Sequence, residues 1–373
     1  MFCNFIIYVF TLNWFLAFIF AGFTPSRKAS HFSSLVENKL YFGGGFNENS
    51  TTEFFYLDIS KPFTLTDNTS ISWVDLTYTD APRKSRTTAC VGGINNNDIF
   101  IFGGLNYDNY FVKRFDTIKQ KWVNITSIGD IIENNVPENR TFISCAKFSN
   151  ELIAIFGGNS TAFLNDLWIY NISSSLWWKS NALNAPLPRQ EYCAITLPGE
   201  NILYIGGYGG NSGSRGLMSM DDLPLYYTKS NTWSSVKTYG TTPPPRKLFS
   251  AILTSDGRII IFGGANVNDT VMFGDLWILD LATSRWSVGN ILNPITDLTL
   301  SRHTANLVGN YMIIGFGEFS KSNYSSRIFM LDISQKDTYR WVTEFTPPTE
   351  SANEFTSASA DAAKIKLIVI HNN

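Results

Sequence analysis

Short apolar segments alternate with polar turns along the chain, and this pattern predicts many short strands rather than long helices. Five of these segments end directly in two glycines, as in IFIFGG and IIIFGG. The pairs are Gly43–Gly44, Gly103–Gly104, Gly157–Gly158, Gly206–Gly207 and Gly263–Gly264, with Gly317–Glu318 as a degenerate sixth copy. Their first glycines are 60, 54, 49, 57 and 54 residues apart. Such regular spacing with variable loops indicates one structural unit repeated six times.

Two further features recur in every unit. An arginine precedes the first glycine by 15 to 17 residues, and a tryptophan follows the next apolar strand. The arginines are Arg27, Arg86, Arg140, Arg189, Arg246 and Arg302. The tryptophans are Trp73, Trp122, Trp177, Trp233, Trp286 and Trp341. The unit therefore contains four short strands, and the tryptophan lies on the last of them.

A four-stranded sheet of this kind has two faces that neighbouring sheets must cover. Radial closure of the sheets covers both faces and leaves only short, protected edges. The tryptophan then fills the space between neighbouring sheets, where a large flat side chain buries the most area. A solenoid is the rival architecture, but four strands in a repeat near this length favour a propeller.

The combination of arginine, glycine pair, polar strand end and tryptophan resembles the Kelch repeat of the galactose-oxidase-like propeller family. The resemblance extends over residues 27–345. It implies an all-β, Kelch-type β-propeller with six complete four-stranded blades. Residues 346–373 resemble the first half of another repeat, with His371–Asn372 where the glycines would stand. We expect this tail to supply ring-closing strands or to form a truncated seventh blade.

The N-terminal segment differs from the repeats. Residues 1–22 contain no charged side chain and are almost wholly apolar from Phe5 to Ile19. A signal peptide cleaved near Ala21–Gly22 is our interpretation, with the propeller at 23–345. An uncleaved signal-anchor is the alternative, because about 20 apolar residues can span a bilayer. The prediction is a secreted or cell-surface protein that contacts a membrane only if the segment stays attached.

Charge excludes one class of partner. Charged residues make up 16% of the chain, the formal net charge is −2 and no run of Lys and Arg occurs. Nucleic-acid binding needs clustered cations that displace counterions from phosphates. We therefore predict no nucleic-acid partner.

Candidate catalytic residues are few. The family resemblance raises the copper-radical oxidases of this fold, which need two histidines, two tyrosines and a cysteine joined to one tyrosine. The chain has three histidines: His31 and His303 follow repeat arginines, and His371 lies in the tail. No HExxH, Cys-x-x-Cys or phosphate-loop motif is present. We predict no catalytic site, no cofactor and no metal; a galactose-oxidase-like carbohydrate oxidase is the alternative.

The cysteines outside the N-terminal segment occupy matching places. Cys90, Cys145 and Cys193 stand four or five residues after a repeat arginine, on the first strand of three consecutive units. We expect such strands to be farther apart than the Cα limit of about 7 Å for a disulfide. The prediction is that the three residues are small buried apolar side chains.

Asn-x-Ser/Thr sequons favour an exported glycoprotein. The predicted glycosylation sites are Asn49, Asn68, Asn124, Asn139, Asn159, Asn268 and Asn323. An eighth sequon, at Asn171, ends a strand at a turn and is left out of this prediction.

Two long loops are candidate ligand contacts, because rigid propellers carry variable loops on their faces. Residues 209–222 contain Arg215, Met218 and Met220, and residues 266–274 contain Met272 and Phe273. Apolar side chains in a loop anchor a partner or pack beneath the loop. The predicted function is a non-catalytic scaffold that binds a protein or glycan through these face loops.

Overall fold

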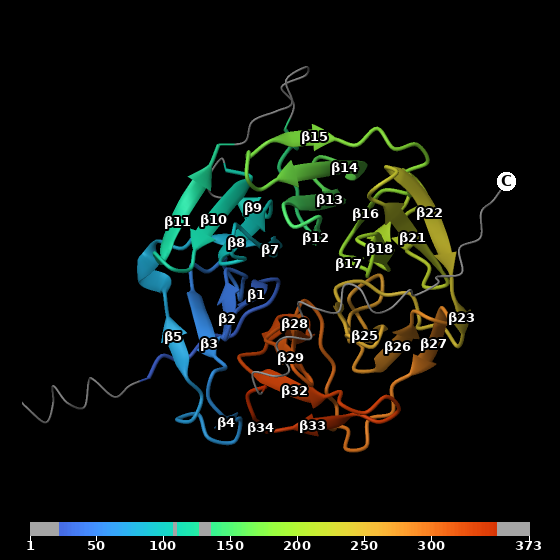
Figure 1. Cartoon of the computed structure of the whole chain (residues 1–373). Helices are drawn as coiled ribbons and strands as arrows, with labels where there is room; N and C mark the ends of the chain where they lie inside the picture. Colours follow the sequence, from blue (N-terminus) through green and yellow to red (C-terminus); the bar gives the residue numbers. More distant parts are fainter. Residues whose placement is uncertain (1–21, 107–109, 127–135, 349–373) are drawn as a thin grey trace, which may run out of the picture.

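The computed structural model describes residues 22–106, 110–126 and 136–348. Six antiparallel units of four strands, here called blades 1 to 6, are arranged around one axis (Figure 1). The sheet of blade 5 has a fifth strand, β23 (Tyr239–Gly240), which pairs in parallel with its outermost strand β27 (Arg285–Val288). Every blade is built from one continuous stretch of chain, and its first strand lies nearest the axis. The predicted all-β propeller of six complete four-stranded blades is confirmed.

The strands of each blade follow one another from the axis outward. Blade 1 contains β1 (Phe32–Val36), β2 (Lys39–Gly43), β3 (Phe54–Asp58) and β5 (Trp73–Asp75); blade 2 contains β7 (Thr88–Gly92), β8 (Asp98–Phe102), β10 (Val112–Asp116) and β11 (Lys121–Ile125); blade 3 contains β12 (Cys145–Phe148), β13 (Leu152–Asn159), β14 (Phe163–Asn171) and β15 (Trp177–Lys179). Blade 4 contains β17 (Cys193–Thr196), β18 (Ile202–Ile205), β21 (Asp222–Tyr227) and β22 (Thr232–Lys237); blade 5 contains β24 (Ser250–Leu253), β25 (Arg258–Phe262), β26 (Leu276–Asp280) and β27 (Arg285–Val288); blade 6 contains β28 (Thr304–Val308), β29 (Tyr311–Gly315), β32 (Ile328–Asp332) and β33 (Arg340–Val342).

Further short strands are present in addition to the four strands of each blade. They are β4 (Phe63–Thr64), β6 (Lys84–Ser85), β9 (Leu105–Asn106), β16 (Arg189–Gln190), β19 (Tyr208–Gly209), β20 (Gly216–Leu217), β23 (Tyr239–Gly240), β30 (Glu318–Ser320), β31 (Asn323–Tyr324) and β34 (Glu344–Phe345). A 3-10 turn, η1 (Thr77–Thr79), follows β5. Since successive strands of a blade are antiparallel, the loop after its second strand and the connection between blades emerge at the same end. We call this end the mouth face.

The apolar core is divided among the six interfaces between blades. The second and third strands are covered on both sides, and all five residues of β25 are buried. A side chain from the outermost strand completes each interface cluster, and these residues are the six predicted tryptophans. Their predicted place between neighbouring blades is confirmed.

The ring closes between the first and the sixth blade. Strand β1 contacts β28 directly, and Phe42 of blade 1 packs on Phe316 of blade 6 with ring centroids 5.2 Å apart. At the outer edge, β34 pairs with β4 through Glu344↔Thr64 and Phe345↔Phe63. The first and sixth blades thus share a core with no sheet between them in the described residues. Of the predicted tail segment 346–373, residues 349–373 lie outside the described residues.

The glycine pairs occupy left-handed backbone, but two of the pairs were assigned one residue out of register. In the geometry that recurs in the blades, the first residue of the pair has φ near +60° and the second has φ near +95°. These two residues are Gly44–Gly45 in blade 1 and Phe316–Gly317 in blade 6. The amide of the second glycine donates to a carbonyl of the next blade, for example Gly104 N to Arg140 O at 2.8 Å. A Cβ on Gly103 would lie 2.3 Å from the same oxygen.

The repeat arginine forms a motif with an aspartate and a tryptophan in two blades. In blade 3, Arg140 binds both oxygens of Asp166 at 2.6 and 3.2 Å, and Trp168 Nε1 donates to Asp166 Oδ2 at 2.6 Å. In blade 5, Arg246, Asp275 and Trp277 repeat this arrangement with distances of 2.6, 2.9 and 2.6 Å. We call it the Arg–Asp–Trp motif.

Three of the six arginines were assigned to the wrong position. The carbonyls that accept from the preceding blade's second glycine belong to Lys28, Lys84 and Leu300 in blades 1, 2 and 6. Arg27 therefore lies one residue before the motif position, whereas Arg86 and Arg302 lie two residues after it. Adjacent basic residues in the sequences SRK and KSR made the two registers look equivalent.

We predict that Gly103→Ala is more destabilising than Gly199→Ala. Both glycines have positive φ, +61° and +89°, but the Cβ of Gly199 meets no atom within 4 Å. Left-handed backbone alone costs about 1–2 kcal/mol, which is the loss expected for Gly199→Ala. Gly103→Ala adds the clash with Arg140 O, so urea unfolding should show at least twice that loss. Equal losses would show that the close approach is not a constraint.

Candidate binding site at the mouth of the central channel

A cavity of about 350 Å³ runs along the axis of the propeller. Its walls are the innermost strands and the residues immediately before them, from all six blades. These segments are equivalent in every blade, so each blade contributes a residue at each equivalent position of the wall. We call this cavity the central channel.

A closed ring of six backbone hydrogen bonds surrounds the channel at the mouth face. Each member donates its amide to the carbonyl of the corresponding residue in the preceding blade, at 2.8 to 3.0 Å. Each member also has left-handed backbone, with φ between +51° and +59°. The members, which we call the axial ring, are Ser30, Arg86, Phe142, Glu191, Leu248 and Arg302.

One side of the axial ring is neutralised by a network of charges. Arg302 Nε lies 2.9 Å from Glu318 Oε2, and its Nη2 lies 3.1 Å from Asp269 Oδ2. Lys247 Nζ bridges Asp269 at 3.3 Å and Glu191 at 3.4 Å. Burial raises the pKa of Glu191, against the opposing effect of Lys247.

Arg86 differs from Arg302 because its guanidinium forms no ion pair with a carboxylate of the described residues, although the more distant charge of Glu191 favours its cationic form. Its guanidinium lies over the rings of Phe142 and Phe46, 4.8 and 5.7 Å from their centroids. Its Nε has no hydrogen-bond partner among the described residues. Burial, followed by the nearby charge of Arg302, lowers the pKa of Arg86. The result is a half-buried cation between two aromatic faces at the opening of the channel.

The two histidines in the described part of the chain, His31 and His303, are buried in the framework, and the third, His371, lies outside the described residues. His31 Nε2 is 2.9 Å from Thr304 Oγ1, and His303 Nε2 is 2.7 Å from Ser250 Oγ. Burial lowers the pKa of His31 well below its usual range and that of His303 to about 3. Within the described ranges, no group of three or more His, Cys, Asp or Glu is placed to hold a metal ion.

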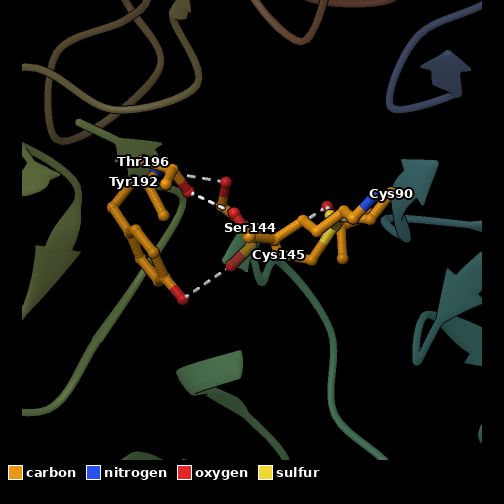
Figure 2. The surroundings of a disulfide bond; sticks show 8 residues. Cys90, Ser144, Cys145, Tyr192 and Thr196 are labelled. Atoms are coloured by element: carbon orange, nitrogen blue, oxygen red, sulfur yellow. Dashed lines mark hydrogen bonds between the residues drawn. A yellow bond between two sulfur atoms is a disulfide. The ribbon is translucent and has the colours of Figure 1, made fainter. Parts of the chain in front are cut away.

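Cys90 and Cys145 form a disulfide, so the prediction that all three cysteines are unpaired was wrong. Their Cα atoms are 6.3 Å apart, within the range that a disulfide spans. The innermost strands converge at the axis, where β7 and β12 are in contact, and this brings equivalent positions closer than we expected. Figure 2 shows the bridge beside Ser144, whose Oγ accepts from Ala194 N at 3.1 Å.

Cys193 is the cysteine of the described residues that stays free. Its thiol donates to Phe249 O at 3.3 Å, and burial raises its pKa to about 12. A thiol held in its protonated form is a poor nucleophile, so the predicted role of an inert small side chain applies to Cys193.

The predicted loop residues differ in burial and in their contacts. Met220 is 2% exposed and belongs to the core between blades 4 and 5, where its carbonyl accepts from Trp286 Nε1. Arg215 is exposed and its guanidinium lies 4.2 Å from the centroid of Phe163. Phe273 covers the guanidinium of Arg246 at 4.3 Å. Met218 and Met272 are half-buried.

The sequons lie on several parts of the propeller. Asn49, Asn268 and Asn323 are exposed in loops that follow the second strands of blades 1, 5 and 6, on the mouth face. Asn139 is exposed just before blade 3, and Asn159, at the end of β13, is half-buried. Asn68 and Asn124 are exposed elsewhere on blades 1 and 2. Asn171 Oδ1 accepts from Ser174 N in a turn.

The fold defines the class of this protein as a six-bladed β-propeller, and comparisons with known proteins identify its family. The model for the KLHDC2/KLHL20/DRC7 Kelch-repeats domain matches residues 4–207 and 193–371. The chain belongs to the Kelch-repeat family, whose repeats typically build non-enzymatic, protein-binding scaffolds.

Among similar proteins is the Acyl-CoA-binding domain-containing protein 4 of Arabidopsis thaliana, 24% identical over 91% of this chain and 50% of its own length. Host cell factor 1 of Rattus norvegicus is 26% identical over 43% of this chain and 9% of its own length. The chain thus spans half or less of these curated relatives. The solved structure titled "Structure of YjhT" superposes with a TM-score of 0.65 at 13% identity, covering 85% of this chain and 98% of that one.

The axial ring was not found from sequence. No single residue type is common to all six members, and only their position marks them: each stands two residues after the motif position.

None of the described segments forms an apolar helix long enough for a bilayer crossing.

We predict that replacing both Cys90 and Cys145 by alanine lowers the free energy of unfolding by about 2–4 kcal/mol. The bridge closes a loop with a sequence separation of 55 residues, and cross-links of this span stabilise chiefly by restricting the unfolded chain. Urea unfolding with and without a reductant measures the effect. The variant should be insensitive to the reductant, and Cys193→Ala should leave the reductant effect unchanged.

We further predict that His303 makes the fold sensitive to mild acid. Its pKa is about 3 in the fold and about 6.5 when unfolded, so the unfolded chain alone binds this proton between those values. Stability present above pH 6.5 is therefore lost as the pH falls, by about 2 kcal/mol between pH 6.5 and 5. His303→Phe, which copies Phe249 of blade 5, should reduce that loss by this amount in urea unfolding at each pH. An unchanged pH profile contradicts a buried neutral imidazole.

Proposed function

We propose that this protein is an exported Kelch-repeat scaffold that binds a protein ligand at the mouth of its central channel. The observation that carries the proposal is Arg86, a cation between Phe46 and Phe142 whose Nε has no hydrogen-bond partner in the described part of the chain. Partial burial of a cation whose Nε has no hydrogen-bond partner costs free energy, and a carboxylate that reaches Arg86 recovers this cost. The proposed ligand therefore presents an acidic side chain or a free C-terminal carboxylate.

The surroundings of Arg86 favour a narrow polypeptide segment. The axial ring is rigid, because each residue is fixed by backbone hydrogen bonds on both sides. The opposite part of the mouth is internally neutralised by Lys247, Asp269 and Glu318. One anionic group seated on Arg86 thus finds a prearranged site, and preorganisation lowers the cost of binding.

Export is supported by three features of different origin. The disulfide between Cys90 and Cys145 is typical of oxidising compartments. Exposed sequons such as Asn49 and Asn268 are accessible to glycosylation. The apolar segment 1–22, of which the structure describes only Gly22, has the composition of a signal peptide or a signal-anchor.

The binding proposal predicts the outcome of selection from a random peptide library displayed on phage. Selected peptides should carry Asp, Glu or a free C-terminal carboxylate, and Arg86→Gln should weaken them at least tenfold, since a hydrogen bond to a charged group contributes about 1.5–3 kcal/mol. Arg340→Gln, an exposed arginine on the outer strand β33, is the matched control and should bind normally. Selection of peptides without acidic groups, or equal binding by Arg86→Gln, contradicts the proposal; binding of neutral glycans instead would favour a glycan ligand.

The export proposal predicts the state of the protein secreted from a eukaryotic host. N-terminal sequencing should find a start near residue 22, and glycosidase treatment should lower the mass. The disulfide should be present without added oxidant. An intact Met1, absence of glycans and reduced Cys90 would together refute export, whereas Met1 on membrane-bound glycosylated protein would identify a signal-anchor.

A further inference from the structure

Blade 4 contains an incomplete Arg–Asp–Trp motif. Arg189 and Asp222 stand where blade 5 has Arg246 and Asp275, but Pro224 takes the place of the tryptophan. The indole that lies between blades at Trp168 and at Trp277 is therefore missing at the interface of blades 3 and 4.

The remaining members of the motif in blade 4 are left without their partners. Arg189 is 5% exposed, and its Nε makes no hydrogen bond with any described residue. Asp222 binds Lys237 Nζ at 2.8 Å through Oδ2, while its buried Oδ1 has no partner there. In blades 3 and 5 the same arginine is held by both oxygens of its aspartate.

Pro224 also loosens the sheet beside the missing indole. The pairing of β18 with β21 is reduced to Ile202↔Tyr226 and Leu203↔Leu225, whereas β25 and β26 pair over five residues in blade 5. Proline cannot donate to a ladder, so the strands separate where it stands.

A cavity occupies this place. Its volume is about 630 Å³, within the range of small-molecule sites. Arg189, Asp222 and Pro224 line it together with the aromatic side chains of Tyr227 and Trp233. It shares no lining residue with the central channel, so it is independent of the proposed protein-binding mouth.

We propose that this cavity binds a small indole carboxylate, a planar bicyclic ring that carries an N–H donor and a carboxylate. The ring occupies the place of the missing tryptophan side chain. Its N–H donates to Asp222 Oδ1, as Trp168 and Trp277 donate to Asp166 and Asp275. Its carboxylate accepts from Arg189, in place of the aspartate that holds Arg140 and Arg246.

Arg189 Nε and Asp222 Oδ1, the two atoms without a hydrogen-bond partner among the described residues, require both parts of this ligand. A buried guanidinium seeks an anionic acceptor, and a buried carboxylate oxygen seeks a donor. A purely apolar ring fills the space but leaves both groups unsatisfied, and a simple carboxylate leaves the space empty. Burial lowers the pKa of Arg189 to about 10, so the group is cationic at neutral pH.

The test is calorimetric titration of the full chain with indole-3-acetate, 1-methylindole-3-acetate and indole. We expect saturable binding of indole-3-acetate and at least tenfold weaker binding of each of the other two, because one lacks the N–H and the other the carboxylate. Equal affinity of the three compounds, or no saturation at millimolar indole-3-acetate, overturns the proposal.

Variants locate the binding to this cavity. Pro224→Trp restores the motif and fills the cavity, so it should abolish binding; the strand accepts tryptophan at this place in blades 3 and 5. Val288→Trp adds an exposed tryptophan on β27 and should bind normally. Arg189→Gln, which removes no hydrogen bond, should bring the affinities for indole-3-acetate and indole to within about twofold. Unchanged binding of indole-3-acetate by Pro224→Trp rejects the site. If Pro224→Trp does not fold, the deciding result is Arg189→Gln: an unchanged ratio of the affinities for indole-3-acetate and indole rejects the site.

Discussion

The axial ring of hydrogen bonds is the constraint on which this propeller depends. Each innermost segment must turn through left-handed backbone to reach its neighbour, and bulky residues such as Phe142 and Leu248 adopt it at φ +58° and +59°. Left-handed backbone is unfavourable for these residue types. The conformation is held because the ring closes on itself, from Arg302 to Ser30, and every member supports the next.

Because of this constraint, the backbone positions at the mouth do not depend on which side chains they carry. The hydrogen bonds use only backbone atoms, so the side chain at each ring position is free to vary while its place at the mouth stays fixed. The six positions accordingly carry a hydroxyl, two guanidinium groups, an aromatic ring, a carboxylate and an aliphatic chain. A rigid frame that presents arbitrary side chains at one opening is suited to recognition.

Sequence reasoning found the fold because the tryptophans and glycines mark each blade by type. It failed where two neighbouring residues offered the same type. Arg86 and Lys84 are both basic, and only the carbonyl that accepts from Gly45 shows that Lys84 holds the motif position. The distance between Cys90 and Cys145 could likewise not be predicted from the sequence, because it depends on how strongly the inner strands converge. In the described part of the chain the Nε atoms of Arg86 and Arg189 have no hydrogen-bond partner. This property depends on neighbours in three dimensions and cannot be predicted from residue spacing.

Departures from the repeat are of two kinds, and the difference between them has functional meaning. Lys28 replaces the arginine of blade 1, but Glu53 binds its Nζ at 2.5 Å and Phe55 covers it. Lys84 donates to the carbonyls of Gly103 and Tyr110, and the apolar Leu300 needs no partner. In these blades a changed residue is matched by a changed neighbour. Blade 4 keeps the repeat arginine, but the Nε of Arg189 has no hydrogen-bond partner among the described residues. Because unsatisfied buried groups cost stability, a fold that compensates three such changes and leaves the fourth open points to an external partner there.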